Sequence, residues 1–227
     1  MSKLSIVIPV LDEGEGIAAA LDRLADLRAL GTEVIVVDGG SRDATIQRAR
    51  PRADRVILAP RGRALQMNAG AEKASGDVLL FLHADTRLPA DADHVVLSGL
   101  ERSGRAWGRF DVKIEGRSAL LRVIARLMNI RSRLTGIATG DQAIFVRRAA
   151  FQAAGGFPAI PLMEDIALCK RLKRVSPPLC LRDCVVTSGR RWEKNGVLKT
   201  MALMWRLRLA YFFGADPKKL AQQYGYE

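Results

Sequence analysis

The sequence predicts an α/β protein with a mostly parallel central sheet, flanked by helices and followed by a C-terminal helical extension. Up to Pro89, short apolar segments alternate with helical patterns, which indicates right-handed βαβ units and a parallel sheet. The segment 78–82 is apolar at every position and is typical of a strand that is buried on both faces. The chain of 227 residues has the length of one such domain.

The first part of the chain supplies four of the predicted strands. The helix after the first strand is expected to run over 14–30, because Ile17, Leu21 and Leu24 share one face. Ser41 is expected to cap the helix after the second strand. The predicted strands are 5–10, 33–37, 55–59 and 78–82, and the predicted helices are 14–30, 41–50 and 62–74.

The alternation changes after Pro89. Phe110, Val112 and Ile114 alternate with charged residues, which predicts a strand over 107–114. Without a long linker, we expect one domain over 1–192 and a C-terminal helical extension over 193–227 packed on it. The other predicted elements are helices at 92–102, 118–129 and 163–173, a loop at 136–141, strands at 143–146 and 184–187, and a long helix that begins near Asn195.

The chain carries a large positive charge. It has 36 basic and 24 acidic residues, a formal net charge of +12 and a pI near 10.3. This balance suits an anionic membrane surface or a phosphorylated substrate. We expect no nucleic-acid partner, because aromatic residues are few, the basic residues are scattered, and no nucleic-acid recognition motif is present.

The cysteine pattern and the hydropathy of the chain indicate a cytoplasmic location. Cys169, Cys180 and Cys184 have no disulfide spacing, and no histidine lies near the pair 180 and 184, so reduced thiols are expected instead of a zinc site. The N-terminus has no signal-peptide pattern, and no run of about 18 uncharged apolar residues is present. Peripheral binding to the inner face of the membrane is compatible with these features.

Acidic residues follow three of the predicted strands. Asp12 and Glu13 follow the first strand, Asp38 the second and Asp85 the fourth. Ligands in parallel sheets bind beyond the carboxyl ends of the strands, so these acids should line one crevice. Such acids repel one another unless a cation or hydrogen-bond donors lie among them, and a nucleotide with a divalent metal supplies both. The alternative is that each acid merely starts a turn.

Six short segments occur in the order that is found in one enzyme family. The sequence resembles glycosyltransferase family 2, the inverting, metal-dependent sugar transferases with the GT-A fold, over roughly residues 4 to 192. The resemblance implies a nucleotide-diphosphate sugar donor, UDP- or GDP-linked, and Mg²⁺ or Mn²⁺ as cofactor. The segments are Ile8-Pro9-Val10-Leu11-Asp12-Glu13, Val36-Val37-Asp38-Gly39-Gly40-Ser41, Gly76-Asp77 leading to His83-Ala84-Asp85, Gly140-Asp141-Gln142, Glu164-Asp165 and Arg191-Trp192.

The resemblance also implies how the donor is bound. Pro9, Leu11 and Glu13 would line the pocket for the nucleobase, and Asp38 would bind the base or the ribose.

The segment His83-Ala84-Asp85 would contact the donor and its metal. In the family's Asp-x-Asp motif the second acid binds the metal, and here that residue is Asp85. His83 replaces the first acid; its imidazole can reach a ribose or a metal-bound water, but one negative charge is lost.

A second implied group of residues serves the reaction and the acceptor. Asp165 of the pair Glu164-Asp165 would be the general base, and Arg191 would stabilise the diphosphate. A helix N-terminus lowers the pKa of an aspartate, whereas a nearby acid such as Glu164 or Asp141 would raise it. The alternative is that both acids only complement the helix dipole.

The remaining family motifs would lie on the acceptor side. Gly140, Asp141, Gln142 and Trp192 belong to them. Ser188 stands where processive members of the family have glutamine, so we expect a non-processive enzyme.

A polar cluster at the helix that begins with Gly62 is a candidate phosphate site, and a solvated basic face is the alternative. The N-terminus of this helix could face a phosphate. Arg63 could pair with a diphosphate oxygen, and Asn68 belongs to the same cluster.

The last long helix has two apolar faces and therefore needs two partners. One face is expected to pack on the domain, and it consists of Leu198, Met201, Ala202, Trp205, Leu209 and Phe212. The opposite face contains Leu203, Met204, Leu207 and Tyr211. With a similar apolar arc in 118–130, segment 197–213 is expected to contact a membrane that carries a lipid-linked acceptor, or a second subunit in a homodimer. Burial under the chain's own loops is the alternative.

Three other functions share some features with this sequence. The pattern Gly14-x-Gly16-x-x-Ala19 is similar to a dinucleotide-binding motif, but acids would stand where the pyrophosphate must bind. A sugar-nucleotide nucleotidyltransferase would need a Gly-x-Gly-x-x-Arg loop that the sequence lacks. A non-catalytic nucleotide-binding membrane or partner-binding module stays open, because His83 replaces an acid.

Overall fold

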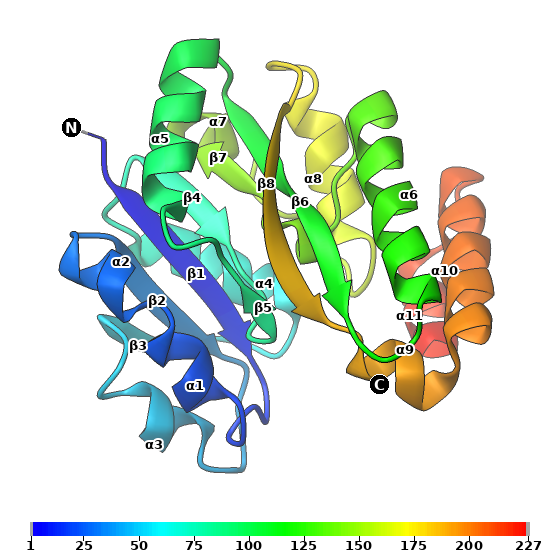
Figure 1. Ribbon diagram of the computed structural model, residues 1–227, viewed down its shortest axis with the longest axis horizontal. Coiled ribbons are helices and arrows are strands. Elements are labelled where there is room, and N and C mark those ends of the chain that lie inside the picture. The colour runs from blue at the N-terminus through cyan, green and yellow to red at the C-terminus, as the bar shows by residue number, and fades with distance from the viewer. Residues whose placement is uncertain (1, 226–227) are drawn as a thin grey trace.

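The computed structural model describes residues 2–225 and has one mixed sheet at its centre (Figure 1). Over these residues the sheet has eight strands in the order β3-β2-β1-β4-β7-β6-β8-β5. The strands are β1 (Leu4–Val10), β2 (Glu33–Asp38), β3 (Arg55–Leu58), β4 (Val78–Phe81), β5 (Thr86–Arg87), β6 (Trp107–Glu115), β7 (Phe145–Arg147) and β8 (Leu179–Ser188).

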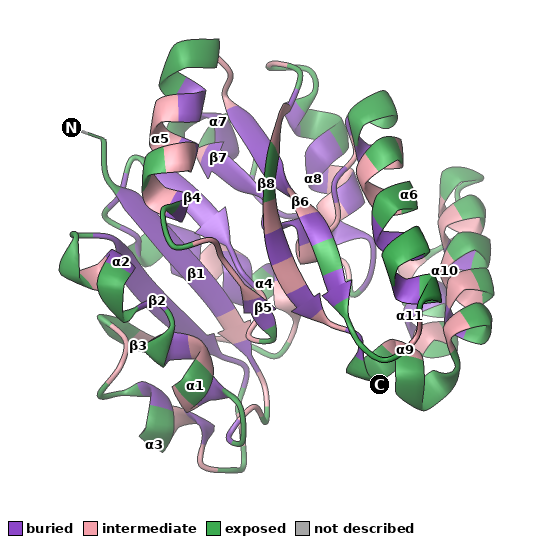
Figure 2. Cartoon of the chain, in the orientation of Figure 1, coloured by how far each residue is buried: buried purple, intermediate pink, exposed green. Residues whose placement is uncertain are grey.

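Helices cover both faces of this sheet. They are α1 (Ile17–Asp22), α2 (Ala25–Ala29), α3 (Thr45–Ala49), α4 (Arg63–Lys73), α5 (Ala92–Ser103), α6 (Leu120–Thr135), α7 (Arg148–Ala153), α8 (Glu164–Leu172), α9 (Arg190–Asn195), α10 (Val197–Phe212) and α11 (Pro217–Tyr224), with a 3₁₀ turn η1 (Gly140–Gln142). Apolar residues of α1, α2, α3, α5 and α6 form one core cluster, and those of α4, α7 and α8 form another on the opposite face. Between them strands β1, β2 and β4 are buried, as Figure 2 shows.

The parallel part of the sheet places several loops at one edge. Strands β1 to β4 run parallel, and Val10 at the end of β1 pairs with Asp38 at the end of β2. Strand β7 is antiparallel to both β4 and β6, whereas β6 and β8 are parallel. The predicted fold class is therefore confirmed, with antiparallel pairs in the second half of the sheet.

Several boundaries differ from the prediction. The expected helix 14–30 is divided into α1 and α2, and α3 begins only at Thr45. Ser41 does not cap α3, because its hydroxyl donates to the Asp38 carboxylate. Helix α6 continues to Thr135 and ends at Gly136, which has a φ of +66°. Strand β8 begins at Leu179, earlier than predicted. Pairing with β6 keeps its first, partly exposed residues in strand conformation, although they show no apolar alternation in the sequence.

The predicted orientation of the last long helix was wrong. Its packed side includes Leu207, which is fully buried, together with Leu203 and Tyr211. These residues contact a cluster around Met163 and helix α11, which the sequence pattern did not predict. A helix with two apolar faces does not itself indicate which face is covered. The face expected to pack is largely exposed, at Leu198, Ala202, Trp205, Leu209 and Phe212, and only Met201 of that set contacts the core.

Candidate active site

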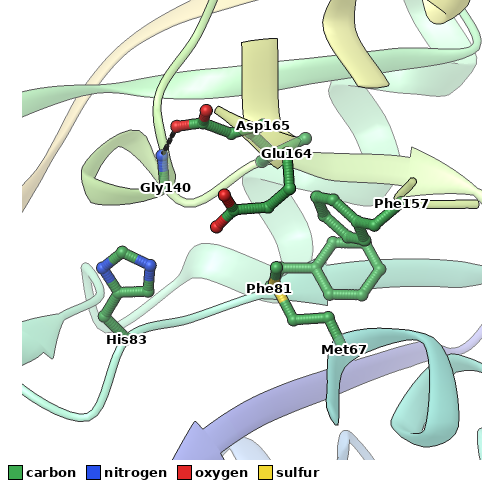
Figure 3. A pocket seen from close by; sticks show the side chains of 8 residues that line it. Met67, Phe81, His83, Gly140, Phe157, Glu164 and Asp165 are labelled. Carbon is green, nitrogen blue, oxygen red and sulfur yellow. Dashed lines mark hydrogen bonds between the residues drawn. The ribbon is translucent and has the colours of Figure 1, made fainter. Parts of the chain in front are cut away.

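A pocket lies where the parallel strands end, between β4, α4, η1 and the first turn of α8 (Figure 3). One side is apolar, and the other carries an imidazole, two carboxylates and a glycine backbone. The lining residues are Met67, Phe81, His83, Gly140, Ile144, Phe157, Glu164 and Asp165. The chain thus brings together residues that are far apart in the sequence.

Asp165 is oriented by two backbone amides. The Gly140 N–H donates to Asp165 Oδ2 at 3.0 Å, and the Ile166 N–H donates to Oδ1 at 2.7 Å. A Cβ atom at position 140 would lie 2.4 Å from His83 Nε2, so a side chain there would collide with the imidazole. Glycine at this position therefore allows η1 to lie between His83 and the carboxylate of Asp165.

Polar contacts connect the four elements around the pocket. His83 Nδ1 lies 3.4 Å from Asp141 Oδ1, and His83 Nε2 lies 3.4 Å from a guanidinium nitrogen of Arg63. Arg63 Nε is 3.5 Å from Glu164 Oε1. The arginine therefore places a positive charge among the acids, as their mutual repulsion requires.

Burial changes the proton affinity of the two acids at the start of α8. Burial raises the pKa of Asp165 and of Glu164 above the usual range. The amides of Gly140 and Ile166 and the charge of Arg63 oppose this rise for Asp165, whereas Asp141 adds to it. A buried aspartate with a raised pKa is a stronger base than an exposed one, as deprotonation of a hydroxyl requires.

Asp141 differs from its neighbours. Burial raises its pKa, but the hydrogen bond and charge of His83, together with Arg63 and Arg191, outweigh this effect and lower the pKa of Asp141. Asp141 therefore stays ionised beside the pocket, where its charge acts on Asp165.

Asp85 lies at the exposed end of the same crevice. The Thr86 hydroxyl donates to Asp85 Oδ1 at 3.4 Å. Burial and the charge of Asp85 raise the pKa of Glu13, and Arg190 and His83 lower it, so these four residues form one electrostatic group. The loops after β1 and β4 are therefore neighbours, as the sequence predicted.

The residues present suit a metal that is brought by a substrate. Within residues 2–225 no group of three or more His, Cys, Asp or Glu side chains could hold a metal ion by itself. Mg²⁺, however, is commonly held by one or two carboxylates together with substrate phosphates. Asp85 offers such a carboxylate, two residues after His83.

Two arginines of α9 lie at the rim of this crevice. Arg190 acts on Glu13, and Arg191 acts on Asp141. Arg191 also stacks on Tyr224 of α11, with its Cζ atom 3.9 Å from the ring centroid. The C-terminal helices therefore contact a predicted site residue directly.

The predicted nucleotide residues are held by the ends of β1 and β2. Pro9 and Leu11 are partly exposed there, whereas Asp38 is fully buried. Asp38 Oδ2 accepts the N–H groups of Gly40 and Ser41 at 2.8 and 2.9 Å. Asp38 therefore shapes its own loop, and only its remaining lone pairs are available to a base or ribose.

Four predicted site residues are held by contacts within the protein. The Asn68 side chain both donates to and accepts from the Phe157 backbone, at 2.8 and 2.9 Å, and so holds the loop before α8. Gln142 is fully buried and donates to Ser132. Ala84 and Trp192 are partly buried against the core cluster. These contacts show how the four residues are held in the fold, and their contact with a ligand stays a prediction.

Two further polar residues lie near the site. Gln66 Nε2 donates to the carbonyls of Val10 and Val37, at 2.8 Å each, and joins the ends of β1 and β2. Arg131 has buried Nε and Nη2 atoms without a hydrogen bond among the described residues, and Asp165 is a charge that acts on it. The only sequence signal for Arg131 is its wheel position, on a different side of α6 from Arg122 and Arg126.

The mixed sheet with an acidic crevice at its strand ends is the architecture of the GT-A glycosyltransferases. The sequence model described as "Glycosyl transferase family 2" matches residues 5–153. The chain therefore belongs to glycosyl transferase family 2.

Curated relatives of this chain include lipid-phosphate sugar transferases. An undecaprenyl-phosphate 4-deoxy-4-formamido-L-arabinose transferase from Yersinia pestis is 31% identical over 164 residues, which cover 65% of this chain and 48% of that protein. The protein of that name from Pseudomonas fluorescens (strain Pf0-1) is 32% identical over 161 residues, which cover 63% and 46%. The chain thus spans about half the length of these relatives.

Solved structures show the same fold at low sequence identity. TarS 1-349 of S. aureus in complex with UDP has a TM-score of 0.67 and 20% identity, covering 82% of this chain and 60% of that one. The mannosyltransferase PcManGT of Pyrobaculum calidifontis in complex with GDP-Man and Mn²⁺ has a TM-score of 0.65 and 21% identity, covering 92% and 61%.

Proposed function

We propose that this protein is an inverting, metal-dependent and non-processive glycosyltransferase that moves a sugar from a nucleotide-diphosphate donor to an acceptor hydroxyl. The observation that carries the proposal is the carboxylate of Asp165, held at 3.0 Å by the Gly140 amide in a pocket at the strand ends. Family membership and the GT-A fold support the same reaction class.

In the proposed reaction, Asp165 accepts the proton of the acceptor hydroxyl while the hydroxyl oxygen bonds to the anomeric carbon. The bond from that carbon to the diphosphate breaks, and the nucleoside diphosphate leaves. One base and one displacement invert the configuration, so no covalent sugar–enzyme intermediate is needed.

The leaving diphosphate needs positive charge around it. Arg63 and Arg191 supply fixed charges at two sides of the crevice, since they act on Glu164 and Asp141. Asp85 would hold Mg²⁺ or Mn²⁺, which would neutralise developing charge on the diphosphate. Relatives of known structure include complexes with Mn²⁺ and with Mg²⁺.

We assign the donor nucleotide to the loops after β1 and β2. Pro9, Leu11 and Glu13 would contact the base, and Asp38 would fix the loop that meets the base or ribose. A UDP- or GDP-sugar is favoured because solved relatives contain UDP, UDP-GlcNAc or GDP-Man.

We further propose that the acceptor is lipid-linked and that the protein binds the cytoplasmic face of a membrane. No helix within 2–225 is long and apolar enough to cross a bilayer. Support comes from the charge of +12, the exposed apolar residues of segments 118–130 and 197–213, and relatives named for a polyprenyl phosphate. A homodimer through the same segments is the alternative.

The presence of a base distinguishes two kinds of lipid acceptor. A lipid phosphate is already an anion and needs no proton removed, whereas a hydroxyl does. The raised pKa of Asp165 therefore favours a hydroxyl on a lipid-linked acceptor. Transfer assays with either acceptor, in the wild type and in Asp165→Asn, separate the two.

A thermal-shift panel tests the proposed donor and cofactor. UDP-, GDP-, CDP- and dTDP-sugars are each added with and without Mn²⁺, and one of them should raise the Tm only when the metal is present. A shift by NAD alone would overturn the proposal. Metal-dependent binding with no transfer to any acceptor would instead support the non-catalytic module, which the missing acid at His83 leaves open.

A further inference from the structure

A second concave region lies apart from the active-site pocket, between the exposed face of β6 and β8 and helix α6. It is an open groove of about 640 Å³. Its residues are Asp111, Val112, Lys113, Ile114, Glu115, Arg122, Ala125, Arg126, Asn129, Ile130, Arg133, Cys184 and Val186, none of which lines the active-site pocket. The groove therefore has its own walls and its own charges.

The acids of this groove are already paired. Asp111 contacts the guanidinium groups of Arg109 and Arg133, the latter at 2.6 Å. Glu115 lies 3.0 Å from Arg87. The negative charges of the groove are thus neutralised by the protein itself.

Three cations of the groove have no such partner. Lys113, Arg122 and Arg126 are exposed and form no ion pair within the described part of the chain. Arg122 and Arg126 are one helical turn apart, where like charges destabilise a helix. Helix α6 contains four arginines and no acid, so nothing on the helix offsets this repulsion. An external anion bound between Arg122 and Arg126 would offset it.

An apolar ridge runs along α6 beside these cations. Leu120, Val123, Leu127 and Leu134 are between 43% and 81% exposed. At 100° per residue they lie directly next to the stripe of Arg122 and Arg126.

Helix α10 extends this ridge. It is drawn beside α6 in Figure 1, and its Val197 and Met201 pack against the core cluster that includes Leu121 of α6. Its outer face exposes Trp205, Leu209 and Phe212, each at 60% or more. A basic stripe next to apolar and aromatic side chains is the pattern of an interfacial helix on an anionic membrane.

We propose that the groove between β6, β8 and α6 binds the phosphate headgroup of an anionic membrane lipid, while the α6–α10 ridge enters the apolar edge of the bilayer. Lys113, Arg122 and Arg126 would contact the headgroup. A second copy of the chain fits less well, because the same three cations would meet in a symmetric contact and repel. This inference deepens the proposed membrane contact but does not depend on sugar transfer.

Vesicle flotation of the full chain tests this proposal. Wild-type protein should float with vesicles of phosphatidylcholine and phosphatidylglycerol and stay behind with phosphatidylcholine alone. Arg122→Gln/Arg126→Gln should weaken binding to the anionic vesicles by roughly tenfold to thirtyfold, since each basic residue near such a surface contributes about 1 kcal/mol. Thermal melts check that this variant is folded.

A charge-matched control separates the groove from net charge. Arg23 and Arg50 are exposed, lie at the ends of α1 and α3, and form no ion pair with any residue of 2–225. Arg23→Gln/Arg50→Gln should float like the wild type. An equal loss in both double variants would overturn the proposal, as would unchanged binding of Arg122→Gln/Arg126→Gln.

Three further readouts complete the test. A thermal shift with millimolar glycerol phosphate, in a protein that does not float with anionic vesicles, would assign the groove to a soluble phosphate compound and overturn the lipid assignment. A dimer, seen by light scattering, that does not bind vesicles would overturn the lipid assignment as well. Nucleotide thermal shifts should be the same in Arg122→Gln/Arg126→Gln as in the wild type, so failure of the donor assay leaves this inference separately testable.

Discussion

The guanidinium of Arg191 lies over the ring of Tyr224, with its Cζ atom 3.9 Å from the centroid, and donates to the Tyr224 carbonyl at 3.3 Å. A residue of the last helix thus holds an arginine that acts on Asp141 at the pocket. The C-terminal helices are therefore connected to the site and are not only a cover over the core.

Tyr224→Ala should loosen Arg191 and weaken donor binding. A stacked arginine on an aromatic ring contributes about 0.5–2 kcal/mol, so the donor KM is expected to rise about twofold to thirtyfold. Tyr224→Phe keeps the ring and should bind the donor like the wild type. A donor KM that does not change in Tyr224→Ala would show that the stack does not position Arg191.

Gly140→Ala should reduce kcat more than it changes the donor KM. The new Cβ would lie 2.4 Å from His83 Nε2 and would displace the amide that holds Asp165. Misplacing a catalytic group by about 1 Å costs on the order of a hundredfold in rate. Gly16→Ala is the matched control, since a Cβ there meets nothing within 4 Å, and it should keep wild-type kcat.

Asp165→Asn should nearly abolish transfer to a hydroxyl acceptor. Loss of a general base costs about a hundredfold to ten-thousandfold in kcat. Donor binding, read by thermal shift, should persist. A variant that keeps more than a tenth of the wild-type rate would remove Asp165 from the role of base.

The pH dependence of activity should reflect the raised pKa of Asp165. The base acts only when ionised, so kcat/KM should fall as the pH decreases through this raised pKa, above the usual aspartate value of about 3.9. An acid limb of the pH–rate profile near 4 would contradict this expectation.

The raised pKa of Asp165 should affect the pH dependence of stability in the direction opposite to its effect on activity. A carboxyl whose pKa is raised on folding stabilises the protein below its unfolded pKa, and this contribution is lost as the pH rises through the folded pKa. Asp165→Asn should therefore be more stable than the wild type at neutral pH and lose this advantage near pH 4. Urea unfolding at both pH values measures the difference.

Asp85→Asn should remove the metal dependence of nucleotide binding. The exposed carboxylate of Asp85 is the proposed metal ligand, so the Mn²⁺-dependent part of the thermal shift should disappear. Asp183→Asn is a control at another exposed aspartate and should change nothing. His83→Asp restores the two-acid pattern of the family and should lower the Mn²⁺ concentration at half-maximal shift.

Local patterns in the sequence were sufficient for the parallel part of the sheet and for the positions of most of its acids. The apolar runs of β1, β2 and β4 are buried as predicted, and Glu13 and Asp85 follow them into one crevice. This works because strand periodicity and the rule that ligands bind beyond parallel strand ends need no knowledge of distant contacts.

Other features depend on contacts between distant segments. Asn68 holds the Phe157 backbone, and nothing in its own helix indicates that partner. Arg131 lies among basic residues of α6, yet only the packing of α6 near α8 brings it near Asp165.

By itself, the sequence determined the fold class, the family and the order of the acidic loops, because these follow from local periodicity and short motifs. Only the tertiary structure decided that Leu207 instead of Trp205 faces the domain. It also decided that Tyr224 reaches Arg191, and that Gly140 connects His83 to Asp165. The reason is physical. The hydropathy of a helix indicates that an apolar face must be buried, whereas the shape of the fold and the path of the chain decide which segment packs on that face.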